Sequence, residues 1–273
     1  MFLLGSAYPT GKLGVNASVP PILFGALRMG IVFLCLYPFC KIILPNKKYI
    51  LPLLGFSFSM GVCVNLFLYL SVNASSIMSP LVIGAQLSIP IGIILSSIFI
   101  GESINYKKWI LIITSFLGIV LIGFDPKIAD EIIGFLLICG MAFFYASSQV
   151  FSRYLKELDV KFTSASMGFV AFIILINASI FFEGNTISHL KNLNFEAWLM
   201  VLHAGILCSL FGHMSMFYLY KFYPVGQVLP FYALFPVFGM LLSFFIFGEI
   251  PTLIMVIGGI IVISSVFLLQ KVR

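Results

Sequence analysis

Charged residues are scarce in this sequence: they make up 9% of its 273 residues, whereas 61% of the residues are hydrophobic. Soluble domains contain about 25% charged and about 45–50% apolar residues. A water-soluble fold of this size cannot bury so much apolar surface, because a large share of any chain stays at the surface. The lack of charge therefore excludes a soluble enzyme and predicts a protein embedded in lipid.

Metal, disulfide and cofactor patterns are also missing. The five cysteines lie within apolar stretches and form no C-x-x-C pair, so we interpret them as core residues. We find no cleavable signal peptide, no metal-ligand set and no sign of an organic cofactor. The net charge of +6 does not indicate nucleic-acid binding, because the basic residues lie in short segments between apolar runs.

The apolar runs are about 20 residues long, the length of a transmembrane helix, and they show no alternating pattern. In lipid the backbone must satisfy its own hydrogen bonds, which favours helices here. The sequence thus predicts an all-α membrane protein with ten transmembrane helices. Their expected spans are 1–18, 22–44, 50–71, 76–100, 108–124, 132–153, 162–182, 197–220, 225–248 and 252–270. The first helix is short for a bilayer, so we expect the native chain to begin upstream of Met1.

Lys and Arg residues are concentrated on one side of this topology. Placing the N-terminus in the cytoplasm leaves only Lys127 and Lys191 in outer loops. The inner loops and the C-terminus then hold Lys41, Lys47, Lys48, Lys107, Lys108, Arg153, Lys156, Lys161, Lys221, Lys271 and Arg273. This positive-inside bias predicts a multi-pass protein of the bacterial inner (plasma) membrane with both termini in the cytoplasm.

The two halves of the sequence resemble each other. Residues 87–102 match residues 234–249 at a constant offset of 147, which aligns Gly101-Glu102 with Gly248-Glu249. A weaker match at an offset of 141 pairs Lys12 with Arg153. The repeats are expected at 1–124 and 132–270, with five helices each. Because five is odd, the second repeat enters the membrane from the opposite side, as in secondary transporters with alternating access.

Gly5-Ser6 with Lys12, Pro20-Pro21 and the Ala26-Leu27-Arg28 stretch resemble the opening of EamA-type transporters of the drug/metabolite transporter superfamily. The two Gly-Glu pairs look like the repeat hallmark of that family. The resemblance covers essentially the whole chain, although Leu4 stands where a Trp often precedes the Gly-Ser pair. It implies two inverted five-helix repeats and export or exchange of small metabolites. The stretch around Ala85-Gln86 is similar to exporters of amino-acid metabolites.

Polar side chains inside apolar helices are the candidates for substrate binding, since they are costly in lipid. Lys12 is expected either to meet a substrate carboxylate in a central cavity or to extend its ammonium to the outer interface. The other candidates offer hydroxyl or amide groups, which suit a zwitterionic metabolite or interhelical hydrogen bonds. They are Tyr8, Asn65, Tyr69, Gln86, Tyr145 and Gln149.

A second set of residues is expected to control conformational change or proton transfer. We assign Arg28 to helix packing or an outer gate, with substrate contact as the alternative. Pro90, Pro230 and Pro236 interrupt helices 4 and 9 and suggest elements that move beside the cavity. His203 and His213 are candidates for a proton relay or for simple packing. Glu102 and Glu249 are expected to cap an interface.

The leading functional prediction is a secondary transporter of small polar metabolites, with amino acids or their derivatives first. It would act in the bilayer as an exporter, facilitator or exchanger, either as a monomer or as a homodimer. No acidic residue lies inside an apolar run, which disfavours a proton-driven mechanism. Uptake of drug-like, nucleotide-sugar or cofactor-like cargo is the alternative. An intramembrane enzyme or sensor would need a catalytic cluster or an output domain, and we identify neither.

Overall fold

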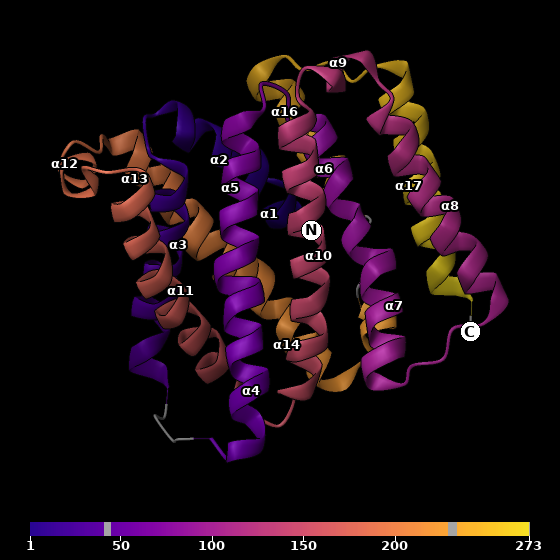
Figure 1. Cartoon of the computed structure of the whole chain (residues 1–273), viewed down its shortest axis with the longest axis horizontal. Coiled ribbons are helices and arrows are strands. Elements are labelled where there is room, and N and C mark those ends of the chain that lie inside the picture. Colours follow the sequence, from indigo (N-terminus) through magenta and orange to yellow (C-terminus); the bar gives the residue numbers. More distant parts are fainter. Residues whose placement is uncertain (41–44, 229–233, 273) are drawn as a thin grey trace.

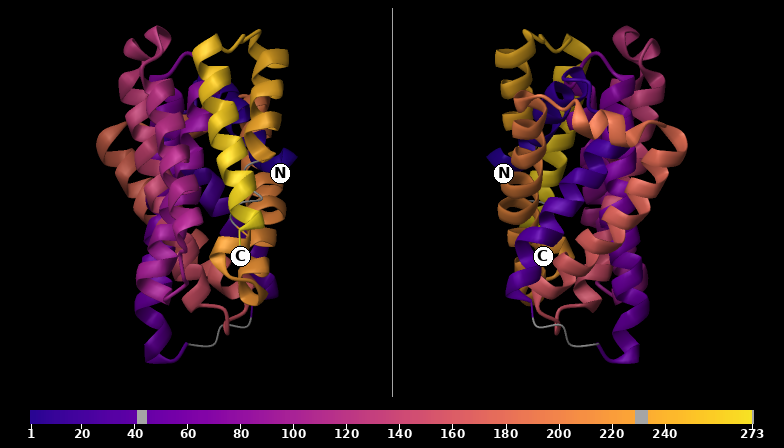
Figure 2. Two further views of the ribbon diagram at one scale, coloured as in Figure 1. Left: turned by 90° about the vertical axis from the view of Figure 1, so that its right-hand side faces the viewer. Right: turned by 90° about the vertical axis from the view of Figure 1, so that its left-hand side faces the viewer.

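The computed structural model describes residues 1–40, 45–228 and 234–272, and this part of the chain is helical without any strand. Seven of its helices are long and apolar enough to cross a membrane, and Phe235–Phe247 and Leu253–Leu269 are shorter apolar helices. The all-helical membrane architecture predicted from the sequence is therefore confirmed. The helices run between two ends of the molecule, where the short connections lie (Figures 1 and 2).

We call residues 1–124 the first half and residues 132–270 the second half. The first half contains α1 (Phe2–Gly5), α2 (Ala7–Asn16), α3 (Pro21–Leu36), η1 (Tyr37–Phe39), α4 (Lys47–Phe56), η2 (Ser57–Cys63), α5 (Val64–Ala74), α6 (Ser79–Gly84), η3 (Ala85–Leu87), α7 (Ser88–Ile100) and α8 (Tyr106–Gly123). The short α9 (Pro126–Ala129) joins the halves. The second half contains α10 (Ile132–Tyr154), α11 (Val160–Phe182), α12 (Thr186–Lys191), α13 (Phe195–Leu202), η4 (His203–His213), α14 (Met214–Phe222), α15 (Val225–Val228), α16 (Phe235–Phe247) and α17 (Leu253–Lys271).

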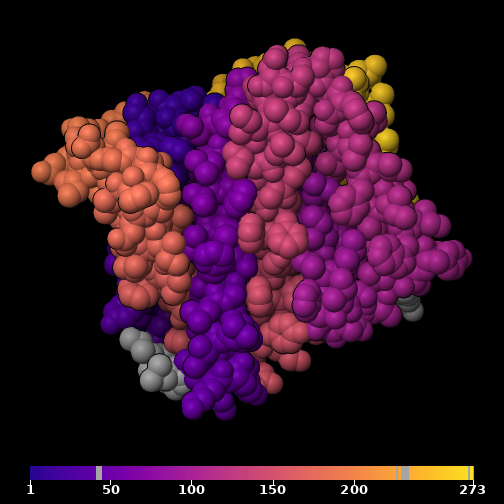
Figure 3. All heavy atoms as spheres, viewed as in Figure 1, coloured from indigo at the N-terminus to yellow at the C-terminus, as the bar shows by residue number. Residues whose placement is uncertain are grey.

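Several elements depart from the spans expected from hydropathy. Within the described residues of the span expected over 22–44, the α-helix ends at Leu36 and is followed by the 3-10 turn Tyr37–Phe39. Pro38 explains this end, because it lacks a backbone N–H and its ring blocks the preceding turn. A helical segment that hydropathy did not predict, α12, projects from the side of the bundle (Figures 1 and 3).

Helix pairs from different halves pack side by side. α3 lies along α11 at one edge of the bundle and α8 along α17 at the other (Figure 1). Between them α10 packs against α5 and α7. Such close approach of two helices needs small residues. Gly118 of α8 and Gly258 of α17 face each other, and a Cβ added to either would lie 3.0 Å or less from the backbone oxygen of the other.

Hydrogen bonds tie the loops together at each end of the bundle. At one end Glu249 binds Met78 and Ser79, Glu131 binds Ser76, and Thr252 donates to Asp125. We call this the Glu249 end. At the opposite end Glu102 accepts a bond from Val225, and the Tyr154 hydroxyl donates to the Phe99 carbonyl. We call this the Glu102 end.

Residues 147 positions apart occupy matching structural positions in the two halves. Gly101 and Gly248 both end their helices in the left-handed conformation, at φ of 79° and 68°. Asn105 and Thr252 both cap the next helix, by accepting from Lys108 and Met255 respectively. The residues 147 positions after those of the π-helical segment η2 all lie in the other π-helical segment, η4.

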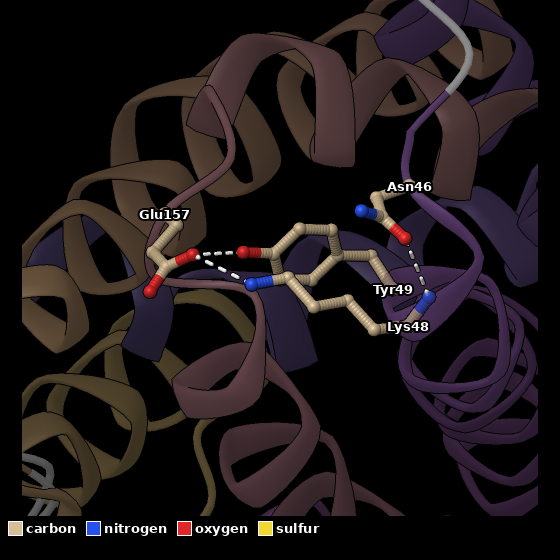
Figure 4. Close-up of polar contacts among 4 residues, drawn as sticks. All are labelled: Asn46, Lys48, Tyr49 and Glu157. Atoms are coloured by element: carbon tan, nitrogen blue, oxygen red, sulfur yellow. Dashed lines mark hydrogen bonds and ion pairs between the residues drawn. The ribbon is translucent and has the colours of Figure 1, made fainter.

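An exposed ion pair joins the two halves at the Glu102 end (Figure 4). The Tyr49 hydroxyl and the Lys48 ammonium both donate to Glu157, with 3.3 Å between Lys48 Nζ and the carboxylate. These two hydrogen bonds lower the pKa of Glu157. Because the pair is well exposed, it contributes little to stability.

Replacing Gly101 or Gly248 by Ala is expected to destabilise the protein by about 1 kcal/mol each. Their Cβ atoms would meet nothing within 4 Å, so the cost comes from the left-handed backbone alone. Melting curves of the purified variants measure this. Gly123→Ala is the matched control, because its Cβ would make only an ordinary contact at 3.5 Å. An equal effect of all three substitutions would contradict the assignment.

The contact at Glu157 is expected to depend on pH. Because the pKa of this carboxyl is lowered in the folded state, its stabilisation is present near pH 7 and is lost as the pH falls through that lowered pKa. Melting curves should therefore show a small deficit for Glu157→Gln at pH 7 that vanishes near pH 3. Asp130→Asn serves as an exposed control. A deficit that persists at pH 3 would contradict the assignment.

Candidate functional site

A small central pocket lies between the two halves. It is lined by Leu4, Ala7, Tyr8, Arg28, Val64, Leu68, Ala85, Ser88, Met141, Tyr145, His213 and Phe235. Its volume is about 40 Å³, close to the share of one water molecule in the liquid. Both halves contribute side chains, and most of the wall is apolar. The pocket is therefore a small site with few polar groups.

Arg28 is the charged residue of this pocket. It is the eighth residue of α3, roughly 10 Å along the helix from its first residue Pro21, and its side chain is 2% exposed. Its Nε donates to Ser209 Oγ at 2.8 Å, and its Nη1 donates to the Tyr69 hydroxyl at 3.2 Å. These two bonds connect α3 with α5 and η4, and they hold the guanidinium in one orientation.

No carboxylate of this protein neutralises Arg28. All nine acidic residues of the sequence lie in connections or at helix ends, and none lines the pocket. Within the described residues Lys48–Glu157 is the only ion pair. A lone Arg at the centre of a transmembrane helix costs roughly 2.5–3.5 kcal/mol on insertion scales. The protein thus keeps an expensive charge at its centre with only hydroxyl partners.

The π-helical segment η4 supplies the main partner of Arg28. Ser209 Oγ donates to the Ala204 carbonyl, five residues earlier, at 3.1 Å. The wider π-helical turn brings Ser209 to face α3 and leaves His213 at the end of the segment, in the pocket wall. Such π-helical segments are frequent at functional sites. Hydropathy alone carries no signal for this local change of helix type.

Aromatic rings form the sides of the pocket. Tyr8 stacks on Phe235, with centroids 5.9 Å apart and an interplanar angle of 5°. Tyr145 lies 5.7 Å from the His213 ring. Tyr69 packs at 4.4 Å on Phe24, behind Arg28. The site therefore combines one fixed cation with flat apolar surfaces.

A larger cavity of about 1090 Å³ opens at the Glu102 end. Its walls include Ile93 and Ser96 of α7, Met216 and Leu219 of α14, and Glu102. The same two helical segments reach the central pocket through Ser88 and His213. Ser88 and Ile93 are separated by a little more than one helical turn. His213 and Met216 are separated by slightly less than one turn. The cavity thus leads from the Glu102 end almost to the central pocket.

The Glu249 end is closed by bonds between the halves. Glu249 accepts from the backbone N–H groups of Met78 and Ser79 at 2.8 and 3.1 Å, and from the Ser79 hydroxyl at 3.0 Å. At the equivalent position, 147 residues earlier, Glu102 accepts from Val225, which is itself 147 residues after Met78. Each glutamate thus caps the helix of the opposite half, as expected for a capped interface.

Lys12 lies away from the central pocket. Its ammonium donates to the carbonyls of Val72, at 3.2 Å, and Ser75, at the C-terminal end of α5. Arg153, its partner in the repeat, donates to the Tyr220 and Lys221 carbonyls at the end of α14. Both cations therefore satisfy helix C-termini, where carbonyls lack intrahelical partners and the dipole favours positive charge. Arg28, assigned to packing or a gate, occupies the position in the cavity expected of Lys12.

The amide candidates lie beside the pocket rather than in its wall. Asn65 donates to the Met60 and Gly61 carbonyls, at 3.2 and 2.8 Å, where η2 passes into α5. Gln149 donates to the Tyr145 carbonyl at 3.2 Å and to Ser148 at 3.1 Å. Gln86 is fully buried in η3. Of the candidates expected in the cavity, Tyr8 and Tyr145 line it, and Tyr69 contacts it through Arg28.

The prolines mark helix starts and breaks. Pro90 is the third residue of α7, directly after the 3-10 turn η3 that interrupts the fourth predicted helix. Pro236 is the second residue of α16, a position that needs no backbone N–H. Pro230 lies outside the described residues.

The two histidines occupy different surroundings. His213 lines the pocket, whereas His203 Nε2 lies 3.3 Å from Ser6 Oγ and Nδ1 lies 3.7 Å from Cys208 Sγ. No chain of described hydrogen bonds joins them. Sequence reasoning missed Ser209 and Ser88, because single serines in an apolar helix give no signal before the facing helix is known.

Comparisons with known proteins agree with this architecture. A solved structure described as "Crystal structure of protein" superposes with a TM-score of 0.67 at 17% identity, covering 99% of this chain and 97% of that one. The "Uncharacterized transporter YdfC" of Bacillus subtilis (strain 168) is 24% identical over 280 residues, which cover 97% of this chain and 86% of the relative.

The apolar helices define a multi-pass membrane protein. The EamA-like transporter family matches residues 1–124 and 132–270, nearly the whole chain. The chain belongs to this family, as the sequence resemblance predicted. It is a membrane transporter, and members of this family are not enzymes.

Removing either of the cations that bind helix C-termini, Lys12 or Arg153, is expected to destabilise the protein. Lys12→Met and Arg153→Met each leave two helix-end carbonyls without their charged donor, at a cost of about 1.5–3 kcal/mol. Thermal melting of the purified variants measures this. Lys191→Met, at an exposed position in α12, is the matched control. If Lys12→Met melted like the control, Lys12 would not be a structural cap.

Proposed function

We propose that this protein is a secondary transporter that moves small polar metabolites across the bilayer by alternating access. The observation that carries the proposal is the large cavity that leads from the Glu102 end toward the central pocket between the halves. Glu249 makes three hydrogen bonds across the halves at one end. At the other end Glu102 borders a cavity of about 1090 Å³. A closed end, a central pocket and an open end are the elements of one transport state.

We infer that ten segments cross the membrane as two inverted repeats, residues 1–124 and 132–270. The matching caps at an offset of 147 support this arrangement, because equivalent residues lie at opposite ends of the bundle. Exchanging the conformations of two such repeats opens one end and closes the other. The reverse state is then one in which the Glu102 end is closed and Glu249 releases Met78 and Ser79.

We further propose that the Glu102 end faces the cytoplasm of a bacterium. Most Lys and Arg residues of the connections belong to this end. Both termini are then cytoplasmic, and the conformation is inward-facing. The absence of carboxylates from the apolar runs favours facilitation or exchange over proton-driven transport.

Amino acids or their derivatives are the cargo class that we propose. Arg28 offers a partner for a carboxylate, and the rings of Tyr8 and Tyr145 offer apolar walls. The small central volume indicates that the group held beside Arg28 is itself small.

Flux measurements in proteoliposomes test the proposal. We expect saturable counterflow of some labelled members of a panel of amino acids and the corresponding carboxylic acids, with none in liposomes that lack the protein. No flux for any member of the panel would contradict the proposed function.

Access to the central pocket tests the alternation. In a cysteine-free background carrying Tyr8→Cys, we expect Glu249→Ala to raise labelling by an impermeant maleimide from the outside severalfold, because the outer cap is lost. Glu196→Ala, an exposed acidic residue at the same end, is the matched control. Equal labelling of both variants would contradict the gate.

A further inference from the structure

The charge of the central pocket selects among the proposed cargoes. Arg28 is the only residue in its wall that carries a permanent charge, and no acidic side chain lines it. The residues outside the described ranges add no acid there, because 41–44 and 229–233 contain none. A zwitterion would bring an ammonium group that meets no carboxylate in this wall. A net anion would instead supply the charge that Arg28 lacks.

The hydrogen bonds of Arg28 leave room for such an anion. A guanidinium has five N–H donors, and Ser209 and Tyr69 take one from Nε and one from Nη1. One N–H of Nη1 and both N–H groups of Nη2 remain for a carboxylate, which a guanidinium can bind through two parallel hydrogen bonds. Since α5 and η4 hold the guanidinium in place, this edge is preorganised for binding.

The dimensions of the pocket agree with a small acid. A volume of about 40 Å³ accommodates a group of carboxylate size. The cavity at the Glu102 end, about one helical turn away, can hold the remainder of the molecule. The stacked Tyr8 and Phe235 rings provide a flat apolar surface for a short carbon chain.

We propose that the cargo is a small organic carboxylate with net negative charge and no ammonium group, and that Arg28 binds its carboxylate and determines this specificity. The inference rests on the proposed transport function and narrows its substrate class to deaminated derivatives or similar acids.

Two matched sets of three ligands test this in a binding assay that does not depend on transport. The probes are 4-methylpentanoate, leucine and 4-methylpentanamide, which share a carbon skeleton and differ in charge, together with propionate, alanine and propionamide. Stabilisation against heat of the purified, full-length protein in detergent at pH 7.5 is titrated for each probe. We expect the acid of at least one set to bind about tenfold or more tightly than both its amino acid and its amide.

Variants separate a role in binding from a role in packing. Arg28→Gln should abolish the preference for the acid, and Arg28→Lys should weaken acid binding severalfold while leaving the amide unchanged. Ser209→Ala removes the bond to Nε but keeps the charge, so it should retain the preference. Should Arg28→Gln not fold, Arg28→Lys and Ser209→Ala carry the comparison.

Three results would overturn the inference: amides that bind as tightly as acids, amino acids that bind more tightly than acids, or no binding of any carboxylate. An unchanged preference in Arg28→Lys would also overturn it. Because these assays are independent of flux, saturable transport of other solutes would leave the proposed function standing while this inference failed.

Discussion

Backbone groups at helix ends must be satisfied where a helix meets lipid or the protein interior, and this requirement organises the whole molecule. Several of the groups that meet it are supplied by another segment. Glu249 caps α6, Glu102 caps α15, and Glu183 accepts from Ile22 and Leu23 at the start of α3. Arg153 satisfies the end of α14 in the same way. The termini of one helix are thus completed by charges held on another.

Such caps give the fold two alternative arrangements. Both caps are formed in this structure, and in the proposed transport cycle the cap at one end breaks when the halves separate there while the other holds. The free energies of the two open arrangements stay close because the same kinds of bonds are broken at either end. In the proposed transport cycle the glutamates stabilise the structure and set access to the pocket through the same contacts, without touching the cargo.

Much of the fold could be predicted from the sequence, because lipid makes the length of an apolar run a direct measure of a helix. The Gly-Glu pairs at 101–102 and 248–249 predicted that these residues occupy equivalent positions in the two halves. In the structure both glycines are left-handed, and each glutamate caps a helix of the opposite half. The functional roles of the cations were harder to assign. Lys12 and Arg28 both look like buried charges in the sequence, and only the packing shows that carbonyls of α5 surround the first and hydroxyls the second.

The π-helical segments explain why the positions of several side chains around the site could not be predicted from the sequence. A wider turn changes which side chains of η4 face α3, so Ser209 and His213 reach the site although their spacing gives no such indication. Asn65 was expected in the cavity and instead bonds to carbonyls of its own helix, because the π-helical turn of η2 leaves them accessible. Local hydrogen bonds of this kind depend on backbone geometry that a hydropathy pattern does not contain.

Distances between spin labels at the two ends would test the alternation between these arrangements most directly. One pair, Asn73 and Ile250, reports on the Glu249 end, and a second pair, Tyr106 and Phe222, reports on the Glu102 end; all four positions are exposed. Pulsed electron paramagnetic resonance in nanodiscs would compare the otherwise unmodified protein with its Glu249→Ala variant. The account predicts that loss of the outer cap lengthens the first distance and shortens the second. Distances that both stay unchanged, or that both lengthen, would contradict it.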